Sequence, residues 1–181
     1  MGSFWGHLTT ITKHRHKVMV HCFKAGIFWQ GLQHDLSKYS PEEFVQGVKY
    51  YQGYRSPNES EREHNGFSRA WMHHKGRNKH HFEYWTDYST KEKRLVPVEM
   101  PVRYVVEMFC DRVAASKIYA GEKYNDSYAL NYFLKGKATR AIHPKTSELI
   151  ENLLTMLAED GEEKTFKYIR NMLKTNGGES K

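Results

Sequence analysis

The chain contains 181 residues, of which 39% are hydrophobic and 14% are aromatic. This composition excludes a disordered protein, because it supplies enough apolar side chains for the core of one domain. The formal net charge of +7 favours an anionic partner, either a small molecule or nucleic acid. We expect one domain over residues 1–175, followed by a frayed tail at 176–181.

Cysteine content and hydropathy restrict the cellular setting. Cys22 and Cys110 form no CxxC motif, so neither a disulfide scaffold nor a cysteine zinc site is expected. No stretch approaches the roughly 20 apolar residues that cross a membrane, and the N-terminus lacks the apolar run of a signal peptide. We therefore predict a cytoplasmic protein without a membrane partner.

Helical periodicity dominates the first half of the chain. A helix is predicted over residues 8–30, with Ile11 and Trp29 on its apolar side. Ser40-Pro41, followed by two acidic residues, indicates the start of a second helix that runs to about residue 51. Three shorter elements are predicted next: a polar loop at 52–65 and helices at 68–74 and 79–87.

The second half of the chain has the same periodicity. Val105, Phe109 and Val113 belong to a long buried helix that begins after Pro101 and that Gly121 ends. Two further helices are predicted at 126–135 and at 146–173, the latter broken near Gly161. No repeat, Gly-rich phosphate loop or alternating strand pattern appears, so the predicted fold class is all-α, a single-domain helical bundle.

Histidine and aspartate side chains are concentrated in four segments that a helical fold could bring together. His34-Asp35 lies at a junction between helices, His14 in the first helix, several histidines at 73–81, and Asp111 in the long buried helix. Imidazole and carboxylate groups bind divalent ions such as Mn, Fe, Co, Ni, Zn or Mg, and one carboxylate can bridge two of them. The pattern therefore predicts a site for one or two divalent metal ions.

Each member of this set has a simpler explanation when it is taken alone. His34-Asp35 would suit a helix cap, and Asp111 could pair with Arg112 or Lys117. A buried carboxylate without a partner is costly, however, and a bound metal is one way to offset that cost. The assembled set supports the metal site more strongly than any single residue.

Two cations close in sequence to the candidate ligands suggest a phosphorylated substrate. A bound divalent ion lowers the pKa of a water molecule and so allows hydrolysis near neutral pH. Lys38 and Arg77 would neutralise the phosphate charge that builds up in the transition state. The predicted substrate is an anionic small molecule.

Three motifs carry a resemblance to known families. They are His-Asp-Leu-Ser-Lys-Tyr-Ser-Pro-Glu-Glu-Phe from His34, Ala-Trp-Met-His-His-Lys-Gly-Arg-Asn-Lys-His-His from Ala70, and Glu-Met-Phe-Cys-Asp-Arg-Val-Ala-Ala-Ser-Lys from Glu107. Over approximately residues 8–173, the chain is similar to an uncharacterised family of bacterial and phage proteins, a domain of unknown function. The order of histidine, His-Asp and a later aspartate also resembles the HD superfamily of metal-dependent phosphohydrolases, and the paired histidines resemble its binuclear branch.

The resemblance implies an HD-like helical fold and a set of metal ligands. Those ligands are His14, His34, Asp35, His74, His80, His81 and Asp111. His16 is a rival to His14, and His73 stays open among the paired histidines. Ser37 stands where the HD motif usually has glycine. Glu83 is a candidate proton shuttle or hydrogen-bond partner of a ligand histidine.

The resulting prediction is a metal-dependent phosphohydrolase. It would cleave a phosphoester, such as a nucleotide or a nucleotide-derived signal, by metal-activated hydroxide, with catalytic residues Asp35, Lys38, Arg77 and Glu83. One alternative is a basic, metal-stabilised protein that binds nucleic acid or an acidic partner; another is a di-iron oxygenase on an HD-like fold. Nucleic acid is not favoured, because the sequence contains no recognised binding module and its positive charge is scattered.

Overall fold

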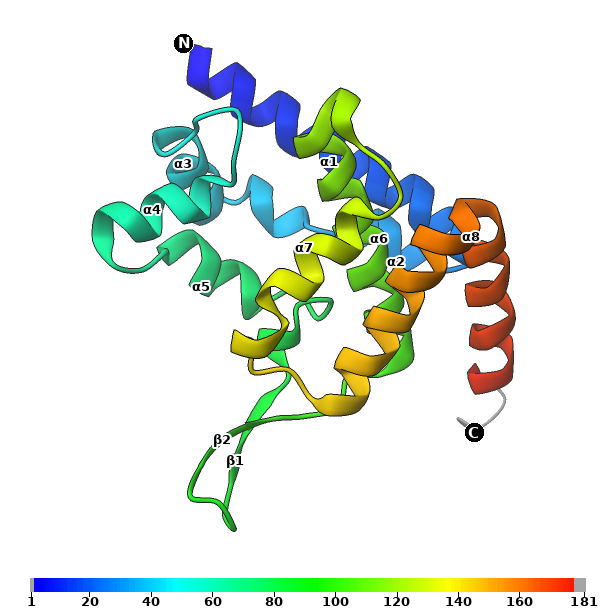
Figure 1. The fold of residues 1–181 in the computed structure, drawn as a ribbon. Helices are drawn as coiled ribbons and strands as arrows, with labels where there is room; N and C mark the ends of the chain where they lie inside the picture. The colour runs from blue at the N-terminus through cyan, green and yellow to red at the C-terminus, as the bar shows by residue number, and fades with distance from the viewer. Residues whose placement is uncertain (1, 178–181) are drawn as a thin grey trace.

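The computed structural model describes residues 2–177, and most of them are helical (Figure 1), which confirms the predicted all-α class. The helices are α1 (Gly2–Ala25), α2 (Phe28–Gln33), α3 (Pro41–Lys49), α4 (Pro57–Asn65), α5 (Arg69–Lys75), α6 (Val102–Ala120), α7 (Tyr128–Gly136) and α8 (Pro144–Gly177). Short 3-10 turns lie at Leu36–Tyr39, Phe82–Tyr84, Gly121–Lys123 and Lys137–Thr139. Within these residues no helix has the length and hydropathy of a membrane span. Of the predicted tail at 176–181, residues 178–181 lie outside the described range.

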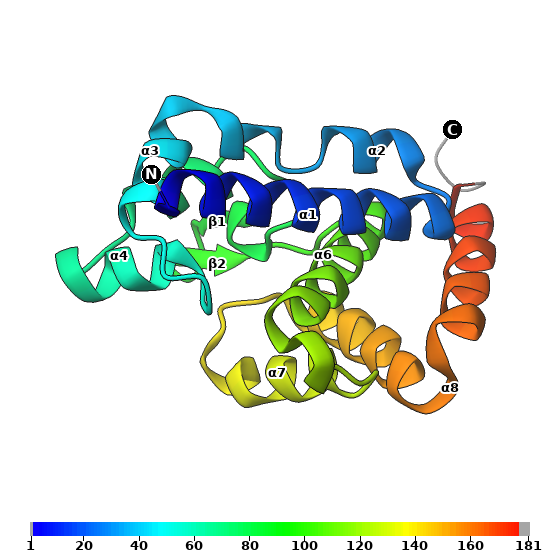
Figure 2. The ribbon, with the colours of Figure 1, turned by 90° about the horizontal axis from the view of Figure 1, so that it is seen from above.

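The hydrophobic core forms where α6 meets α1, α7 and α8 (Figure 2). Phe109 and Val113 of α6 are fully buried, as are Val18 of α1 and Leu154 of α8. Apolar side chains at helical spacing thus give α6 a continuous buried stripe. Gly121 ends this helix with a φ of 53°, as predicted, because glycine adopts the left-handed region without steric cost.

The predicted helix over residues 8–30 is wrong in one respect, because the chain forms two helices there. Gly26 has a φ of 85° and turns the chain, so that α2 packs against α1. Trp29 was expected on the apolar side, but this turn leaves its side chain 77% exposed. The same turn brings the end of α2, and with it His34-Asp35, back beside α1 (Figure 2).

The predicted polar loop at 52–65 is wrong, because it contains α4. This helix begins with a Ser56 cap whose hydroxyl accepts the Asn58 N–H, and Pro57 occupies the first helical position. Glu61 is its buried side chain. Since α4 has no apolar stripe, helical periodicity could not reveal it, although the Ser-Pro start signal is the same as that of α3.

The predicted helix at 79–87 is also wrong. A 3-10 turn is followed by the antiparallel hairpin of β1 (Thr86–Ser89) and β2 (Arg94–Pro97), in which Thr86 lies opposite Pro97. The hairpin projects from the helices (Figure 1), and Leu95 on β2 is 68% exposed. Neither strand therefore has the buried alternating face by which a strand is recognised in a sequence.

The last helix bends at Gly161, as predicted. The φ of 78° and ψ of 174° at this residue suit glycine and interrupt the helical geometry of α8. The part of α8 beyond the bend turns back, and its Phe166 ring lies 5.8 Å from the Phe109 ring of α6, between centroids. Both parts of α8 therefore contribute to one core.

Replacing Leu154 by alanine should destabilise the fold. The side chain is fully buried between α8 and α6, so Leu154→Ala leaves a cavity and should lower the free energy of unfolding by about 3 kcal/mol. Urea denaturation followed by circular dichroism measures this change. Leu95→Ala, on the exposed hairpin, is the matched control and should change stability by less than about 0.5 kcal/mol. Equal effects of the two substitutions would contradict this description of the core.

Candidate metal centre

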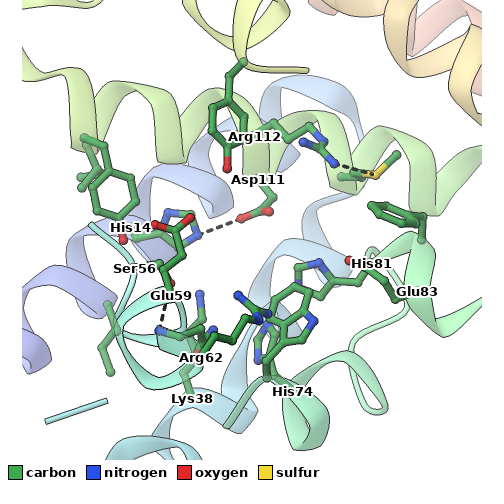
Figure 3. A pocket seen from close by; sticks show the side chains of 18 of the residues that line it. His14, Lys38, Ser56, Glu59, Arg62, His74, His81, Glu83, Asp111 and Arg112 are labelled. Carbon is green, nitrogen blue, oxygen red and sulfur yellow. Dashed lines mark hydrogen bonds and ion pairs between the residues drawn. The ribbon is translucent and has the colours of Figure 1, made fainter. Parts of the chain in front are cut away.

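The seven predicted ligands come together in the structure. They form two groups that share Asp35: His14, His34, Asp35 and Asp111 in one, and Asp35, His74, His80 and His81 in the other. Within each group, one ligand atom from every residue lies within 4.8 Å of the others. Figure 3 shows that His14 and Asp111, as well as His74 and His81, face one pocket. Residues from four separate parts of the chain thus meet at a single carboxylate.

The backbone at Asp35 has an uncommon conformation. Asp35 lies between α2 and the 3-10 turn Leu36–Tyr39 with a φ of 54°, in the left-handed region that aspartate tolerates better than most residues. Its side chain is 1% exposed. This turn allows both carboxylate oxygens to face inward from one chain position.

Each oxygen of Asp35 faces a different set of imidazoles. Oδ2 lies 3.2 Å from His34 Nε2 and 3.9 Å from His14 Nε2. Oδ1 lies 3.2 Å from His74 Nε2 and 3.5 Å from His80 Nε2. Ligand atoms held about 2.1 Å from one ion lie roughly 3.0 to 3.5 Å from each other. The carboxylate is therefore placed to bridge two ions, one for each group.

Asp111 completes the first group from α6. Its Oδ1 atom lies 2.9 Å from His14 Nε2 and 3.6 Å from His34 Nε2. The structure brings His14 to this group, whereas the rival His16 has an exposed side chain on the outer face of α1. Two nitrogen and two carboxylate ligands are a donor set that suits a divalent transition metal.

Several of these ligand atoms are buried without a hydrogen-bond partner. Among residues 2–177, this applies to Nε2 of His14, His34, His80 and His81 and to Oδ1 of Asp35. Close approach alone does not satisfy them, because none of these contacts forms a hydrogen bond. Unpaired buried polar atoms are costly and rare. One cation in each group would satisfy these atoms, so the residues fit metal ions.

Two glutamates that sequence reasoning missed orient the histidines. Glu107 Oε1 accepts from Nδ1 of His34, at 2.9 Å, and lies 3.2 Å from Nδ1 of His80. Glu43 Oε2 likewise accepts from Nδ1 of His74, at 2.7 Å. A proton fixed on Nδ1 leaves the lone pair of each Nε2 directed at Asp35, as in carboxylate–histidine–metal arrangements. Glu107 could also form a ligand group with His34 and His80, but it faces their Nδ1 atoms, away from Asp35.

Glu43 also contacts His73, which the sequence had left open as a possible ligand. Nδ1 of His73 lies 2.7 Å from Glu43 Oε1, and His73 belongs to neither ligand group. The sequence did contain a signal that could have pointed to Glu43, because this residue lies in the first turn of the helix whose Ser40-Pro41 start was recognised. A signal for Glu107 was its position four residues before Asp111, which places both on one face of α6.

The surrounding charges keep the carboxylates ionised. Burial raises the pKa of Asp35, but His34, Lys38 and His74 together hold it well below its usual range. Burial likewise raises the pKa of Asp111, and its contacts with His14 and His34 outweigh that effect and lower it. For His34 the balance is opposite, since burial lowers its pKa but the nearby carboxylates raise it well above 6.5, so a metal ion would have to displace the proton on its Nε2. The centre therefore has anionic oxygens ready to bind a cation.

His14 and His81 have the protonation that metal binding requires. Burial, followed by the charge of Lys38, lowers the pKa of His14 below 6.5. Burial, followed by the charges of His80 and His74, lowers the pKa of His81 well below that value. Both imidazoles are therefore neutral near pH 7, the form in which histidine binds a metal.

A cavity of about 950 Å³ opens beside the centre and is lined by His14, His74, His81 and Asp111. Lys38 also lines it, with Nζ 2.6 Å from Asp35 Oδ2. Glu83 reaches it from the segment after α5 (Figure 3), and burial raises the pKa of its carboxyl group. The predicted Lys38 and Glu83 are thus both adjacent to the ligands.

The structure does not place Arg77 at this cavity. The chain turns after α5, and Arg77 is exposed with Nη1 donating to the His73 carbonyl at 3.3 Å. It lines a different cavity beside α2. Three arginines that the sequence analysis did not select line the main cavity instead: Arg62, Arg112 and Arg140.

Comparison with known proteins identifies a family but no characterised relative. A family described as "Family of unknown function (DUF5662)" matches residues 3–156. This match bears out the predicted resemblance to an uncharacterised family, although it ends before residue 173. No curated protein and no solved structure matches the chain. The resemblance to the HD superfamily stays a prediction.

Replacing Glu107 by glutamine should weaken metal binding without removing a ligand. The neutral amide oxygen accepts more weakly than a carboxylate, and the amide NH2 group would face the Gln30 N–H that Glu107 Oε2 now accepts, so His34 and His80 lose their fixed orientation. Glu107→Gln should lower the affinity for Mn or Zn by about 10- to 100-fold, measured by isothermal titration calorimetry. Glu163→Gln, at an exposed position of α8, is the matched control. An unchanged affinity in the Glu107 variant would show that this carboxylate does not orient the ligands.

Proposed function

The chain belongs to a family of unknown function (DUF5662), and from its candidate metal centre we propose that it is a metal-dependent phosphohydrolase. The observation that carries this proposal is the position of Asp35, whose two oxygens face two separate sets of imidazole nitrogens beside an open cavity. Two divalent ions bridged by a carboxylate are a recurring arrangement for phosphoester cleavage. The proposed substrate is a phosphorylated anion such as a nucleotide.

The ligand set indicates which ions the centre would bind. His14, His34, Asp35 and Asp111 would hold one ion, and Asp35 with His74, His80 and His81 would hold the second. Five imidazoles favour Mn, Fe, Co, Ni or Zn over Mg, which prefers oxygen ligands. Ions held there would supply positive charge for a phosphate and would lower the pKa of a water molecule.

The cavity residues have complementary roles in this proposal. Lys38 Nζ, next to Asp35, would pair with a phosphate oxygen and offset the charge that develops there. Glu83 Oε2 is buried on the cavity wall without a hydrogen-bond partner among the described residues. It would donate a proton to the leaving oxygen. Arg77, given its position, has no role here. Free Cys22 and Cys110 are consistent with a cytoplasmic setting, which we propose as well.

Replacing Asp35 by asparagine tests the shared carboxylate. The amide keeps the size of the side chain but lacks its charge and cannot bridge two ions, so bound metal should fall and hydrolysis should drop at least about 100-fold. Elemental analysis measures the metal. Release of p-nitrophenol from mono- and bis-p-nitrophenyl phosphate, with each candidate ion added, measures activity. Asp160→Asn, on the surface of α8, is the matched control.

Three outcomes would overturn the proposal. One is a wild-type protein that binds no ion and releases no p-nitrophenol with any of them. A second is iron-dependent dioxygen consumption without hydrolysis, which would indicate a di-iron oxygenase. A third is salt-dependent nucleic-acid binding that survives Asp35→Asn in the absence of hydrolysis, which would indicate a binding protein.

A Glu83→Gln variant tests the proton donor. A p-nitrophenolate group leaves without protonation, whereas an alkoxide leaves only when a proton is supplied. Glu83→Gln should therefore reduce kcat for an alkyl phosphate about 100-fold, and reduce kcat for p-nitrophenyl phosphate much less. Equal losses for the two substrates would argue against proton donation. Glu92→Gln on the exposed hairpin is the control.

A further inference from the structure

Two arginines form part of the wall of the cavity that contains the metal centre. Arg112 follows the ligand Asp111 on α6, and Arg140 follows α7. Figure 3 shows Arg112 beside Asp111 at this pocket. Both side chains are half-buried. Neither is a metal ligand, and the roles assigned above to Lys38 and Glu83 do not use them.

Both guanidinium groups are held in place by neighbouring groups. Arg140 Nη1 donates to the Phe133 carbonyl at 2.8 Å, and its Cζ lies 5.7 Å from the centre of the Tyr132 ring. Arg112 and Arg140 each place Cζ 5.5 Å from the centre of the same Phe133 ring. Arg140 also lies over Gly136, where an added Cβ would come within 2.6 Å of its Nη2 atom. The lack of a side chain at Gly136 thus makes room for the guanidinium.

No carboxylate forms an ion pair with either arginine in the described part of the chain, although Asp111 and Glu83 attract Arg112 from further away. Within residues 2–177, no carboxylate oxygen lies within 4.0 Å of a nitrogen of Arg112 or Arg140. Arg112 Nε is buried without a hydrogen-bond partner in that same range, and its Nη2 has only the Met108 sulfur at 3.9 Å. Two adjacent cations with unused donors are suited to bind an oxyanion.

We propose that Arg112 and Arg140 bind a second phosphoryl group of the substrate, while the first lies at the metal centre. This inference rests on the proposed function and narrows its substrate class to nucleotides or related phosphoesters with at least two phosphoryl groups. The planar guanidinium can donate two parallel hydrogen bonds to one phosphoryl group. The substrate would supply the ion-pair partner that neither arginine has among the described residues.

Binding of adenosine 5′-diphosphate and adenosine 5′-monophosphate to the metal-loaded protein tests this site. These probes differ by one phosphoryl group, so calorimetry should show tighter binding of the diphosphate by about 10-fold or more. Arg140→Ala should remove most of this preference, and Arg94→Ala on the exposed hairpin should retain it. Metal content, measured on every variant, reports whether the centre is intact.

Gly136→Ala provides a second test that keeps both charges. The new methyl group would displace the Arg140 guanidinium, so the preference for the diphosphate should weaken even if Arg140→Ala fails to fold. Wild-type discrimination retained in both folded variants, or no preference in the wild type, would overturn the arginine site. Arginine-dependent discrimination without hydrolysis of any phosphoester would instead leave the site standing and reject the phosphohydrolase.

Discussion

The burial of Asp35 is the constraint on which the rest of the centre depends. A carboxylate that is 1% exposed, with imidazoles on both oxygens, needs compensating positive charge. Lys38 supplies part of that charge from three residues away. The remaining unpaired nitrogens face the same carboxylate, so a bound cation would neutralise the oxygens and satisfy the nitrogens together. Metal binding at this candidate centre would therefore be linked to local stability.

Helix α6 carries residues of the hydrophobic core and residues of the candidate metal centre. Phe109 and Val113 pack into the core, while Glu107 and Asp111, one helical turn apart, face the histidines, and Arg112 reaches the cavity wall. A rigid helix that is buried along its length holds such side chains more precisely than a surface loop does. The histidines at 80 and 81 lie outside any helix, and Glu107 supports His80 from α6. The packing of α6 therefore also sets the geometry of ligands that belong to less regular segments.

The sequence identified the ligands but not the groups that support them. Clustered histidines beside an aspartate are uncommon, and their chemistry is specific, so all seven residues of the two candidate groups could be predicted to come together. Glu43, Glu107, Arg112 and Arg140 belong to residue types that are abundant on protein surfaces, so the weak sequence signals for the two glutamates did not distinguish them from exposed residues, and tertiary packing shows which of the four turn inward. The same limit applies to secondary structure. Helices with an apolar stripe were predictable, whereas α4 and the exposed hairpin have no buried apolar face and so show no hydrophobic periodicity in the sequence.

The family match ends just before the bend of α8 at Gly161, but residues beyond the bend also contribute to the core. The family match ends at residue 156, before the bend, yet Phe166 beyond it lies against both Phe109 of α6 and His21 of α1. Ile169, one turn further along, is fully buried in the same core. A shortened chain that stops where the match stops would expose an apolar face of α1 and α6 to water. The core of this protein thus extends beyond the residues that the family match covers, and the part of α8 after the bend shields that core from water.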